Sequence, residues 1–179
     1  MVILNVVSML IIFKGDGKGK TSAALGVALR AVGWGKKVAI IQFIKKKKCG
    51  EHKAVAKYLK NIKIILAGKG FVGIRGDKLS MQKHRLAAEN GFKKAQSAVQ
   101  SKKYQLIILD EILGAISGRL LTIDEVLDLL QNIPAKTDII LTGRGNFPKI
   151  EKIADVVTEC HKIKHSFAKG QKAKKGIDY

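Results

Sequence analysis

A run of glycine and lysine residues near the N-terminus has the residue types that bind phosphate. It reads Gly15-Asp16-Gly17-Lys18-Gly19-Lys20-Thr21. Glycines allow backbone N–H groups to converge on phosphate oxygens, and a helix that begins here adds the positive end of its dipole. In such a loop Lys20 neutralises phosphate charge and the Thr21 hydroxyl binds Mg²⁺. The run therefore predicts an ATP phosphate site in which Lys20 and Thr21 are catalytic candidates.

The spacing within this run is shorter than that of a standard Walker A motif. The standard pattern has its first glycine where this chain has Lys14, and only three residues separate Gly15 from Gly19. A strand-like run precedes the loop and a helical run follows it. We therefore interpret it as a variant P-loop and not as an ordinary glycine-rich turn.

Two further candidates follow apolar runs later in the chain. Asp110 ends the run YQLIIL, and Arg144 follows an apolar run with Gly143 between them. Asp110 fits a Walker B carboxylate that holds Mg²⁺, although a buried acid at a strand end can also be purely structural. Glu111 stands where hydrolytic P-loop enzymes orient a water molecule. The Arg144 guanidinium can pair with phosphate or with a second substrate. Alternatively, Arg144 is an ordinary surface arginine without a functional role.

Apolar runs of strand length alternate with helical patterns and predict how these residues are held. Helices are expected at Thr21–Val32 and Lys78–Ser101. Continuous apolar strands separated by helices predict a single α/β domain over residues 1–179, P-loop NTPase-like, with a mainly parallel sheet in three α/β/α layers. Such sheets bind ligands beyond the carboxyl ends of their strands, where the motifs above all fall. The expected strands are Leu10–Lys14, Val38–Ile44, Ile62–Leu66, Leu106–Leu109 and Ile139–Thr142.

A further helix has the clearest start signal in the chain. Thr122 can cap it, Glu125 can complete a capping box, and Leu121 with Val126 forms a candidate hydrophobic staple. Asp124 and Glu125 are then acids of the first helical turn, which favour the positive end of the helix. They need no role in catalysis.

Composition and cysteine usage indicate an ordinary intracellular globular protein. The chain has 179 residues, of which 46% are hydrophobic and 27% charged. No stretch of ~18 uncharged apolar residues occurs. Met1–Phe13 is apolar but lacks a basic start and a cleavage site, so we expect a first strand there, with residues 1–8 a possible extension before Met9. Cys49 and Cys160 stand far apart in the sequence, so we expect neither a disulfide nor a zinc site. A chain without disulfides favours the reducing cytoplasm as its location.

The net charge of +20 favours polyanionic ligands. Nucleic acid is one class of such ligand, but no RNP-type or helix-turn-helix signature accompanies the charge. A lysine-rich surface without function is the plainer interpretation. Two basic segments, Lys45–Lys48 and the tail after Glu159, are predicted to be mobile.

Several short segments, together with the P-loop, resemble the P-loop type of ATP:corrinoid adenosyltransferases, which act on cob(I)alamin or cob(I)yrinic acid a,c-diamide. The resemblance implies transfer of the 5′-deoxyadenosyl group of ATP to Co(I) of a corrinoid, with release of triphosphate, in adenosylcobalamin biosynthesis or salvage. It covers nearly the whole chain. The segments are Ala23–Gly26, Arg30–Gly33, Lys36–Val38, Gln42–Lys45, Leu109–Glu111, Thr142–Gly145, Lys164–Phe167, Gly170, Ala173 and Gly176–Tyr179.

The same resemblance implies the layout of the site. The shortened loop holds ATP in a reversed orientation that presents the 5′ carbon, and residues 160–179 form a basic lid in which His165 and Phe167 contact ATP. Arg30, Phe71 and Arg144 are then corrinoid-binding candidates. The family resemblance also implies Mg²⁺, a homodimer, and a flavodoxin-like flavoprotein that reduces the cobalt.

This chemistry agrees with the residues present. Co(I) is a nucleophile that needs no general base, so catalysis becomes positioning together with stabilisation of charge on the leaving triphosphate. Two positions depart from the family pattern. Asp16 replaces an asparagine, which is tolerable where the carboxylate faces ribose or a basic neighbour. Gly73 replaces a tryptophan that helps to make Co(II) reducible, whereas Phe71 matches the family phenylalanine.

Two other functions remain open at this point. The first keeps the P-loop but transfers the γ-phosphoryl group, as an ATPase or kinase does, and Glu111 beside Asp110 is compatible with it. The second is a basic nucleic-acid-binding module, which leaves Gly15–Thr21 unexplained.

Overall fold

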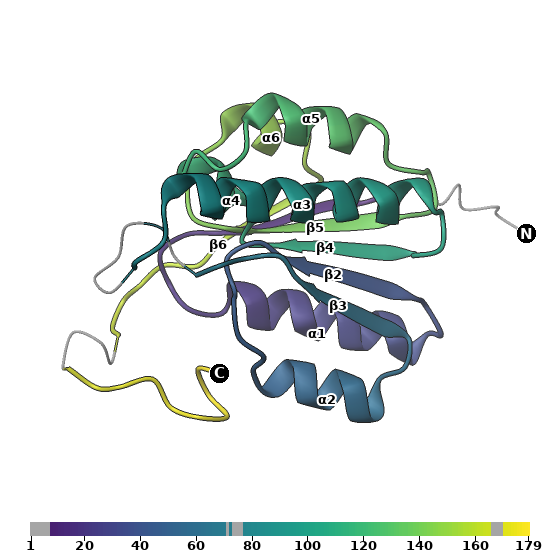
Figure 1. The fold of residues 1–179 in the computed structure, drawn as a ribbon. Helices are drawn as coiled ribbons and strands as arrows, with labels where there is room; N and C mark the ends of the chain where they lie inside the picture. The colour runs from purple at the N-terminus through teal and green to yellow at the C-terminus, as the bar shows by residue number, and fades with distance from the viewer. Residues whose placement is uncertain (1–7, 71, 73–76, 166–169) are drawn as a thin grey trace, which may run out of the picture.

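Six parallel strands form one sheet through the centre of the molecule (Figure 1). The computed structural model describes residues 8–70, 72, 77–165 and 170–179. The strand order is β3-β2-β4-β5-β1-β6, and every neighbouring pair is parallel, which confirms the predicted α/β fold. The strands are β1 Leu10–Lys14, β2 Val38–Gln42, β3 Ile62–Leu66, β4 Leu106–Asp110, β5 Asp138–Gly143 and β6 Val156–Glu159.

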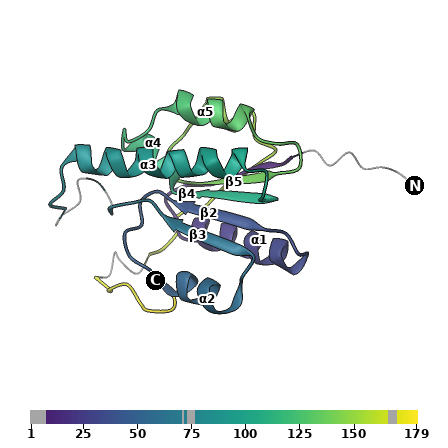
Figure 2. The same ribbon diagram turned by 45° about the vertical axis from the view of Figure 1, so that its right-hand side comes forward.

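Helices cover both faces of the sheet and make three layers (Figures 1 and 2). One face carries α1 (Lys20–Gly33) and α2 (Gly50–Tyr58). The other face carries the remaining helices. These are α3 (Met81–Gln100), α4 (Ile112–Ser117), α5 (Ile123–Gln131) and α6 (Pro148–Glu151).

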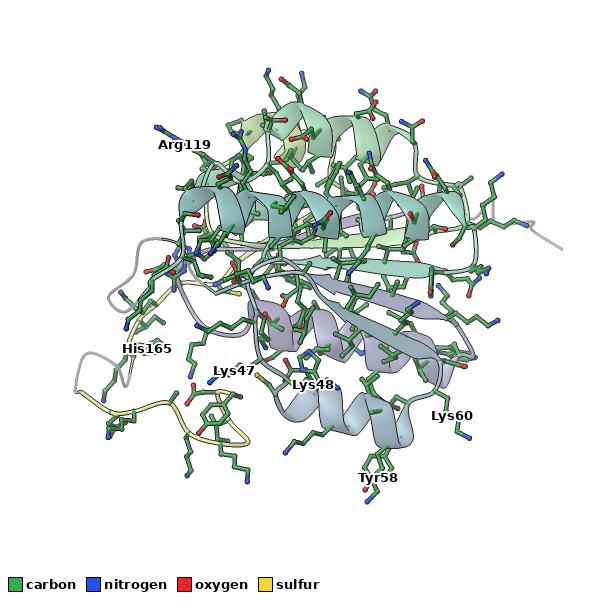
Figure 3. The ribbon with its side chains drawn as sticks, viewed as in Figure 1. Lys47, Lys48, Tyr58, Lys60, Arg119 and His165 are labelled. Atoms are coloured by element: carbon green, nitrogen blue, oxygen red, sulfur yellow. The ribbon has the colours of Figure 1, made fainter. Side chains whose placement is uncertain are left out.

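The protein has two hydrophobic cores, one on each face of the sheet, because successive side chains of a strand point to opposite faces. In β2, Val38 and Ile40 belong to the core between the sheet and α1. Ala39 and Ile41 belong to the core on the other face, which α3 covers. The strands are apolar throughout since both of their faces are covered. Charged side chains such as that of Lys60 point outward into solvent (Figure 3).

Strand and helix ends differ from the sequence prediction by a few residues. Strand β2 ends at Gln42 and not at Ile44, although Phe43 and Ile44 stay buried beyond the ladder. Helix α3 begins at Met81 and not at Lys78, because the Ser80 side chain caps it by accepting a bond from the Lys83 N–H. Four short elements, β6, α2, α4 and α6, were not predicted. The elements β6, α4 and α6 have four to six residues, too few to show periodicity, and β6 is exposed along its whole length. Helix α2 is as long as α5, but only His52 of its residues is buried, so it has no apolar stripe.

The predicted capping box at the start of α5 is confirmed. The Glu125 N–H donates to Thr122 Oγ1 at 3.2 Å, and the Thr122 N–H donates to Glu125 Oε2 at 2.7 Å. We expect Thr122→Ala to lower the free energy of unfolding by ~1 kcal/mol, since an orphan backbone donor loses its partner. Urea unfolding measures this loss. Asp124→Ala, in the same turn without a capping bond, is the control, and equal losses in both variants would contradict the assignment.

Candidate active site

The glycine-rich loop joins the end of β1 to the start of α1. Gly15 and Gly19 have φ of 113° and 110°, in the region that favours glycine. A Cβ on Gly15 would collide with the Cys160 carbonyl oxygen, and one on Gly17 would lie 2.7 Å from it. The loop therefore needs glycine both for its backbone path and for close packing against the segment that follows β6.

That segment, Cys160–Lys162, holds the outer side of the loop by backbone bonds. The Gly17 N–H donates to the Cys160 carbonyl at 2.7 Å, and the Cys160 N–H donates to the Lys14 carbonyl at 2.8 Å. The Lys162 N–H donates to Asp16 Oδ1 at 3.2 Å. This bond lowers the pKa of the Asp16 carboxyl. Asp16 thus faces a basic neighbour, one of the two environments that make a carboxylate acceptable in this loop.

Lys20 is almost fully buried at the first position of α1. Its side chain curls over the loop, and Nζ donates to the Gly17 carbonyl at 2.7 Å. Burial of a lysine without an acidic partner is costly unless a ligand supplies the counter-charge. Its position above the loop amides is the one from which an ammonium contacts a bound phosphate.

Asp110 lies beside Thr21 at the carboxyl edge of the sheet. Thr21 Oγ1 donates to Asp110 Oδ1 at 2.8 Å. The Thr142 hydroxyl donates to the same oxygen at 2.7 Å, and Gln42 Nε2 donates to Oδ2 at 3.0 Å. Neighbouring strands β2, β4 and β5 thus fix the carboxylate against the first turn of α1. A hydroxyl and a carboxylate side by side are the hard oxygen donors that Mg²⁺ prefers.

Glu111 is the next acid along and begins α4 with a left-handed backbone. Its φ is 61°, and its N–H donates to Thr142 Oγ1 at 2.9 Å. Burial raises the pKa of the Glu111 carboxyl, and the charge of Asp110 raises it further. Lys20, Arg144 and Lys45 act in the opposite direction.

This raised pKa makes stability depend on pH. Folded Glu111 holds its proton more tightly than the unfolded chain does, so the free energy of unfolding falls as pH rises from about 4.5 through the folded pKa. We expect the Glu111→Gln variant to lack this decrease in the free energy of unfolding. The free energy of unfolding of the variant, relative to that of the parent, should therefore rise between pH 4 and pH 8. Thermal unfolding across this range measures the difference, and a constant difference would contradict the assignment.

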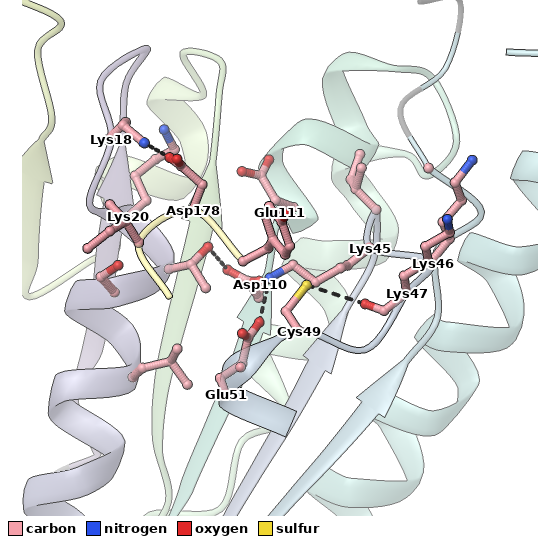
Figure 4. A pocket seen from close by; sticks show the side chains of 18 of the residues that line it. Lys18, Lys20, Lys45, Lys46, Lys47, Cys49, Glu51, Asp110, Glu111 and Asp178 are labelled. Atoms are coloured by element: carbon pink, nitrogen blue, oxygen red, sulfur yellow. Dashed lines mark hydrogen bonds and ion pairs between the residues drawn. The ribbon is translucent and has the colours of Figure 1, made fainter. Parts of the chain in front are cut away.

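A large pocket opens in front of the loop and these acids. Its volume is about 1080 Å³. Figure 4 shows Lys18 and Lys20 on one side, Asp110 and Glu111 in the middle, and Lys45–Lys47 on the other side. A cavity of this size is large enough for a nucleotide.

The structure brings six of the predicted site residues together in this pocket. Lys18, Gly19, Lys20, Thr21, Asp110 and Arg144 all line the pocket. Gly15, Asp16 and Gly17 do not line it and pack against the Cys160–Lys162 segment instead.

Other predicted site residues lie elsewhere. Arg30 is in the last turn of α1, ~15 Å along the helix axis from Lys20, and does not line the pocket. His165 lies outside the pocket lining as well (Figure 3). Phe71, Gly73 and Phe167 fall outside the described residues. Roles for these residues stay predictions.

Two groups of pocket residues were missed as site residues by sequence reasoning. Lys45–Lys47 and Lys69 follow β2 and β3, so the rule about carboxyl ends of strands offered a signal for them. Residues Gly176–Tyr179 at the C-terminus also line the pocket, and Asp178 forms an ion pair with Lys18 (Figure 4). The resemblance placed them within the lid of residues 160–179, but it did not single out any of them as a site residue.

A second group of possible metal ligands lies at the start of α2. Donor atoms of Cys49, Glu51 and His52 lie within 4.8 Å of one another. However, Glu51 is paired with Lys45 at 2.5 Å, and His52 Nδ1 accepts the Cys49 N–H at 3.0 Å. With Glu51 and His52 Nδ1 engaged and a lysine in contact, the cluster suits a helix cap better than a cation.

Comparison with known proteins gives one consistent result. Residues 7–179 match the family model described as ATP:corrinoid adenosyltransferase BtuR/CobO/CobP. A corrinoid adenosyltransferase of Pseudomonas aeruginosa is 35% identical over 96% of this chain and 83% of its own length. The corrinoid adenosyltransferase of Escherichia coli K12 is 34% identical over 96% of this chain and 85% of its own length.

Solved structures of other proteins share the fold at low sequence identity. The flagellar accessory protein FlaH from Methanocaldococcus jannaschii has a TM-score of 0.58 at 18% identity, covering 86% of this chain and 71% of its own. The KaiC-like protein PH0186 from Pyrococcus horikoshii has a TM-score of 0.55 at 16% identity, covering 85% of this chain and 71% of its own.

Proposed function

This chain belongs to the family of ATP:corrinoid adenosyltransferases, which transfer the adenosyl group of ATP to a corrinoid, and we propose which of its residues perform that transfer. One observation carries the proposal. The phosphate loop, Gly15–Thr21, contributes its Lys18–Thr21 part to a single pocket of about 1080 Å³. The Thr21–Asp110 pair faces the same pocket, which is large enough for both substrates to meet.

The phosphate end of the pocket stabilises the leaving group. The electron pair of Co(I) attacks the 5′ carbon of ATP, a cobalt–carbon bond forms, and the bond from this carbon to the triphosphate oxygen breaks. Negative charge then collects on the triphosphate. Lys20 is positioned to stabilise that charge together with amides of the loop other than that of Gly17, and Lys18 can join them once it leaves Asp178.

A reversed ATP orientation is part of the proposal. It is supported by the shortened loop, in which the Gly17 N–H already donates to the Cys160 carbonyl at 2.7 Å. That amide is engaged by the protein, so the loop has fewer donors for the phosphates than a full-length cradle has. A triphosphate held at fewer points is free to turn its 5′ carbon toward the second substrate.

Thr21 and Asp110 are the residues proposed to hold Mg²⁺. Their oxygens are 2.8 Å apart, and the bonds from Thr142 and Gln42 to Asp110 fix the carboxylate. Bound Mg²⁺ neutralises part of the charge of the triphosphate. Arg144 lines the same pocket and is proposed to pair with the triphosphate or with a side chain of the corrinoid.

Product analysis tests this function. The protein is incubated with Mg-ATP and a chemically reduced corrinoid, and the light-sensitive adenosylated product is followed together with the released phosphates. Adenosyl transfer gives one triphosphate per adenosylated corrinoid. ADP and phosphate in place of these products would instead identify γ-phosphoryl chemistry.

Several family properties are proposed with the activity: a homodimer, a flavodoxin-like reductant, a cytoplasmic location, and closure of residues 160–179 over ATP. Among the described residues no helix is both long and apolar enough to cross a membrane. Closure is supported by Gly176–Tyr179, which already line the pocket. Limited proteolysis of the tail with and without Mg-ATP tests it, and unchanged cleavage would argue against closure.

A further inference from the structure

Lys14 ends β1 and stands directly before Gly15, at the position where a standard Walker A motif has its first glycine. Its side chain is 12% exposed, and Lys14 is not among the residues that line the pocket. Nζ donates to Glu151 Oε2 at 2.8 Å and to Asn146 Oδ1 at 2.9 Å. Lys14 therefore joins the start of the phosphate loop to the end of α6 and to residues 144–147, the Arg144 loop, which connects β5 to α6.

Glu151 carries this connection to the backbone of the Arg144 loop. Its other oxygen, Oε1, accepts the Phe147 N–H at 2.9 Å. The bond from Lys14 lowers the pKa of the Glu151 carboxyl, so the carboxylate is charged at neutral pH. The Glu151 side chain is 22% exposed, and a partly buried charge pair is screened by salt less than an exposed pair is. One carboxylate thus binds both the lysine before the phosphate loop and an amide of the Arg144 loop.

The backbone around Arg144 depends on such contacts. Gly143 and Gly145, on either side of Arg144, have φ of 141° and 121°. Glycine has more conformational freedom to lose than any other residue, so the chain does not fix this path locally. The Ser117 hydroxyl donates to the Arg144 carbonyl at 3.0 Å and holds one point of the loop. The contacts of Lys14 hold the part that follows.

The two loops leave the sheet side by side. Strands β1 and β5 are paired, and Lys14 lies opposite Gly143 in their register. Neighbouring strands are ~4.8 Å apart, so the Arg144 loop begins next to the phosphate loop. The Lys14 carbonyl also accepts the Cys160 N–H at 2.8 Å, which fixes its backbone from the side of β6. Lys14 is therefore a fixed point to which the Arg144 loop is attached.

We propose that Lys14 is a positioning residue, which fixes the Arg144 loop relative to the phosphate loop. It acts through Glu151 and Asn146, and the Arg144 guanidinium then keeps one position in the pocket. The inference rests on the proposed function, in which Arg144 pairs with a substrate. A displacement of ~1 Å in a group that orients a substrate can cost as much as about 10²-fold in rate. The residue in place of the Walker glycine thus aligns a second loop of the site.

A double-mutant cycle tests this role. Lys14→Met removes the charge but keeps an unbranched side chain, and we expect it to lower kcat for adenosyl transfer roughly tenfold. KM for ATP should change much less, because Lys14 does not line the pocket. In an Arg144→Ala background the same substitution should change kcat by less than about twofold, since the group that it positions is gone. Lys14→Arg, which can donate to both partners, should retain most of the parent rate.

Lys36→Met is the matched control. Lys36 Nζ pairs with Asp138 Oδ2 at 3.1 Å at the opposite end of β5, and neither residue lines the pocket. Both variants lose an ion pair to the same strand region, and urea unfolding measures the cost of each, but only Lys14→Met should lower kcat. Glu151→Gln leaves one oxygen for two donors and should lower kcat in the same way. It tests the connection even if Lys14→Met folds poorly.

Hydrogen exchange gives a readout that is independent of turnover. The bond to Glu151 protects the Phe147 N–H, so the amides of residues 143–147 should exchange faster in Lys14→Met and not in Lys36→Met. Equal losses of kcat with and without Arg144, or unchanged exchange in Lys14→Met, would overturn the inference. If the parent forms no adenosylated product, the proposed function fails instead, and the exchange comparison decides the role of Lys14.

Discussion

Lys20→Ala is expected to reduce adenosyl transfer by about 10²- to 10³-fold, the loss typical when a preorganised charge-stabilising donor is removed. Nζ is the buried cation that lies over the loop, where it donates to the Gly17 carbonyl at 2.7 Å. Its removal leaves the developing charge on the triphosphate without this partner. The rate of formation of light-sensitive product from Mg-ATP and reduced corrinoid measures the effect.

Folding and function are separable in this variant. The Lys20 side chain makes no ion pair among the described residues, so alanine there leaves no carboxylate unpaired. We expect the circular dichroism spectrum and the unfolding midpoint to stay close to those of the parent. Lys18→Ala, which removes a half-exposed cation already paired with Asp178, is the matched control and should cost less activity. Full turnover in Lys20→Ala would falsify the assigned phosphate role.

Asp110→Asn is expected to lower activity at limiting Mg²⁺ by at least about 10- to 100-fold, the range seen when groups around a metal are altered. Asp110 is 2% exposed, and its carboxylate accepts bonds from Thr21, Thr142 and Gln42. An amide keeps its shape but loses the negative charge that a divalent cation requires. Titration of activity and of ATP binding with Mg²⁺ measures the change.

The fold is expected to tolerate Asp110→Asn because a hydrogen-bond acceptor on Gln42 lies next to the substituted side chain. Gln42 Oε1 is buried and has no hydrogen-bond partner among the residues that the structure describes. If the Gln42 amide turns over, this oxygen can accept a bond from the amide that replaces the Asp110 carboxylate, and the two threonine hydroxyls can donate to the remaining oxygen. A variant that unfolds but recovers full activity at low temperature, with unchanged Mg²⁺ dependence, would show that Asp110 is only structural.

The loop glycines connect the fold to both predictions. Gly15 and Gly17 have no room for a Cβ because the Cys160–Lys162 segment lies against them. That segment leads from β6 toward the C-terminal residues that line the pocket. The phosphate loop is therefore shaped by a segment near the other end of the chain, as the bond from the Lys162 N–H to Asp16 illustrates.

Local chemistry accounts for the features that could be predicted from the sequence alone. The glycine spacing of residues 15–19 predicts the phosphate loop, since a positive φ depends on the residue itself. The Thr122–Glu125 capping box and the strands Leu10–Lys14 and Ile62–Leu66 likewise depend on residues close together in the chain. Alternating apolar and helical runs were sufficient for the parallel three-layer fold.

Tertiary structure alone decided which of these features meet. The order of the strands brings Asp110 Oδ1 to 2.8 Å from Thr21 Oγ1 and places Lys46 and Lys69 at the opposite end of the pocket. Periodicity and capping act over a few residues, whereas strand order depends on packing between segments far apart in the chain, so no local pattern could encode these contacts visibly.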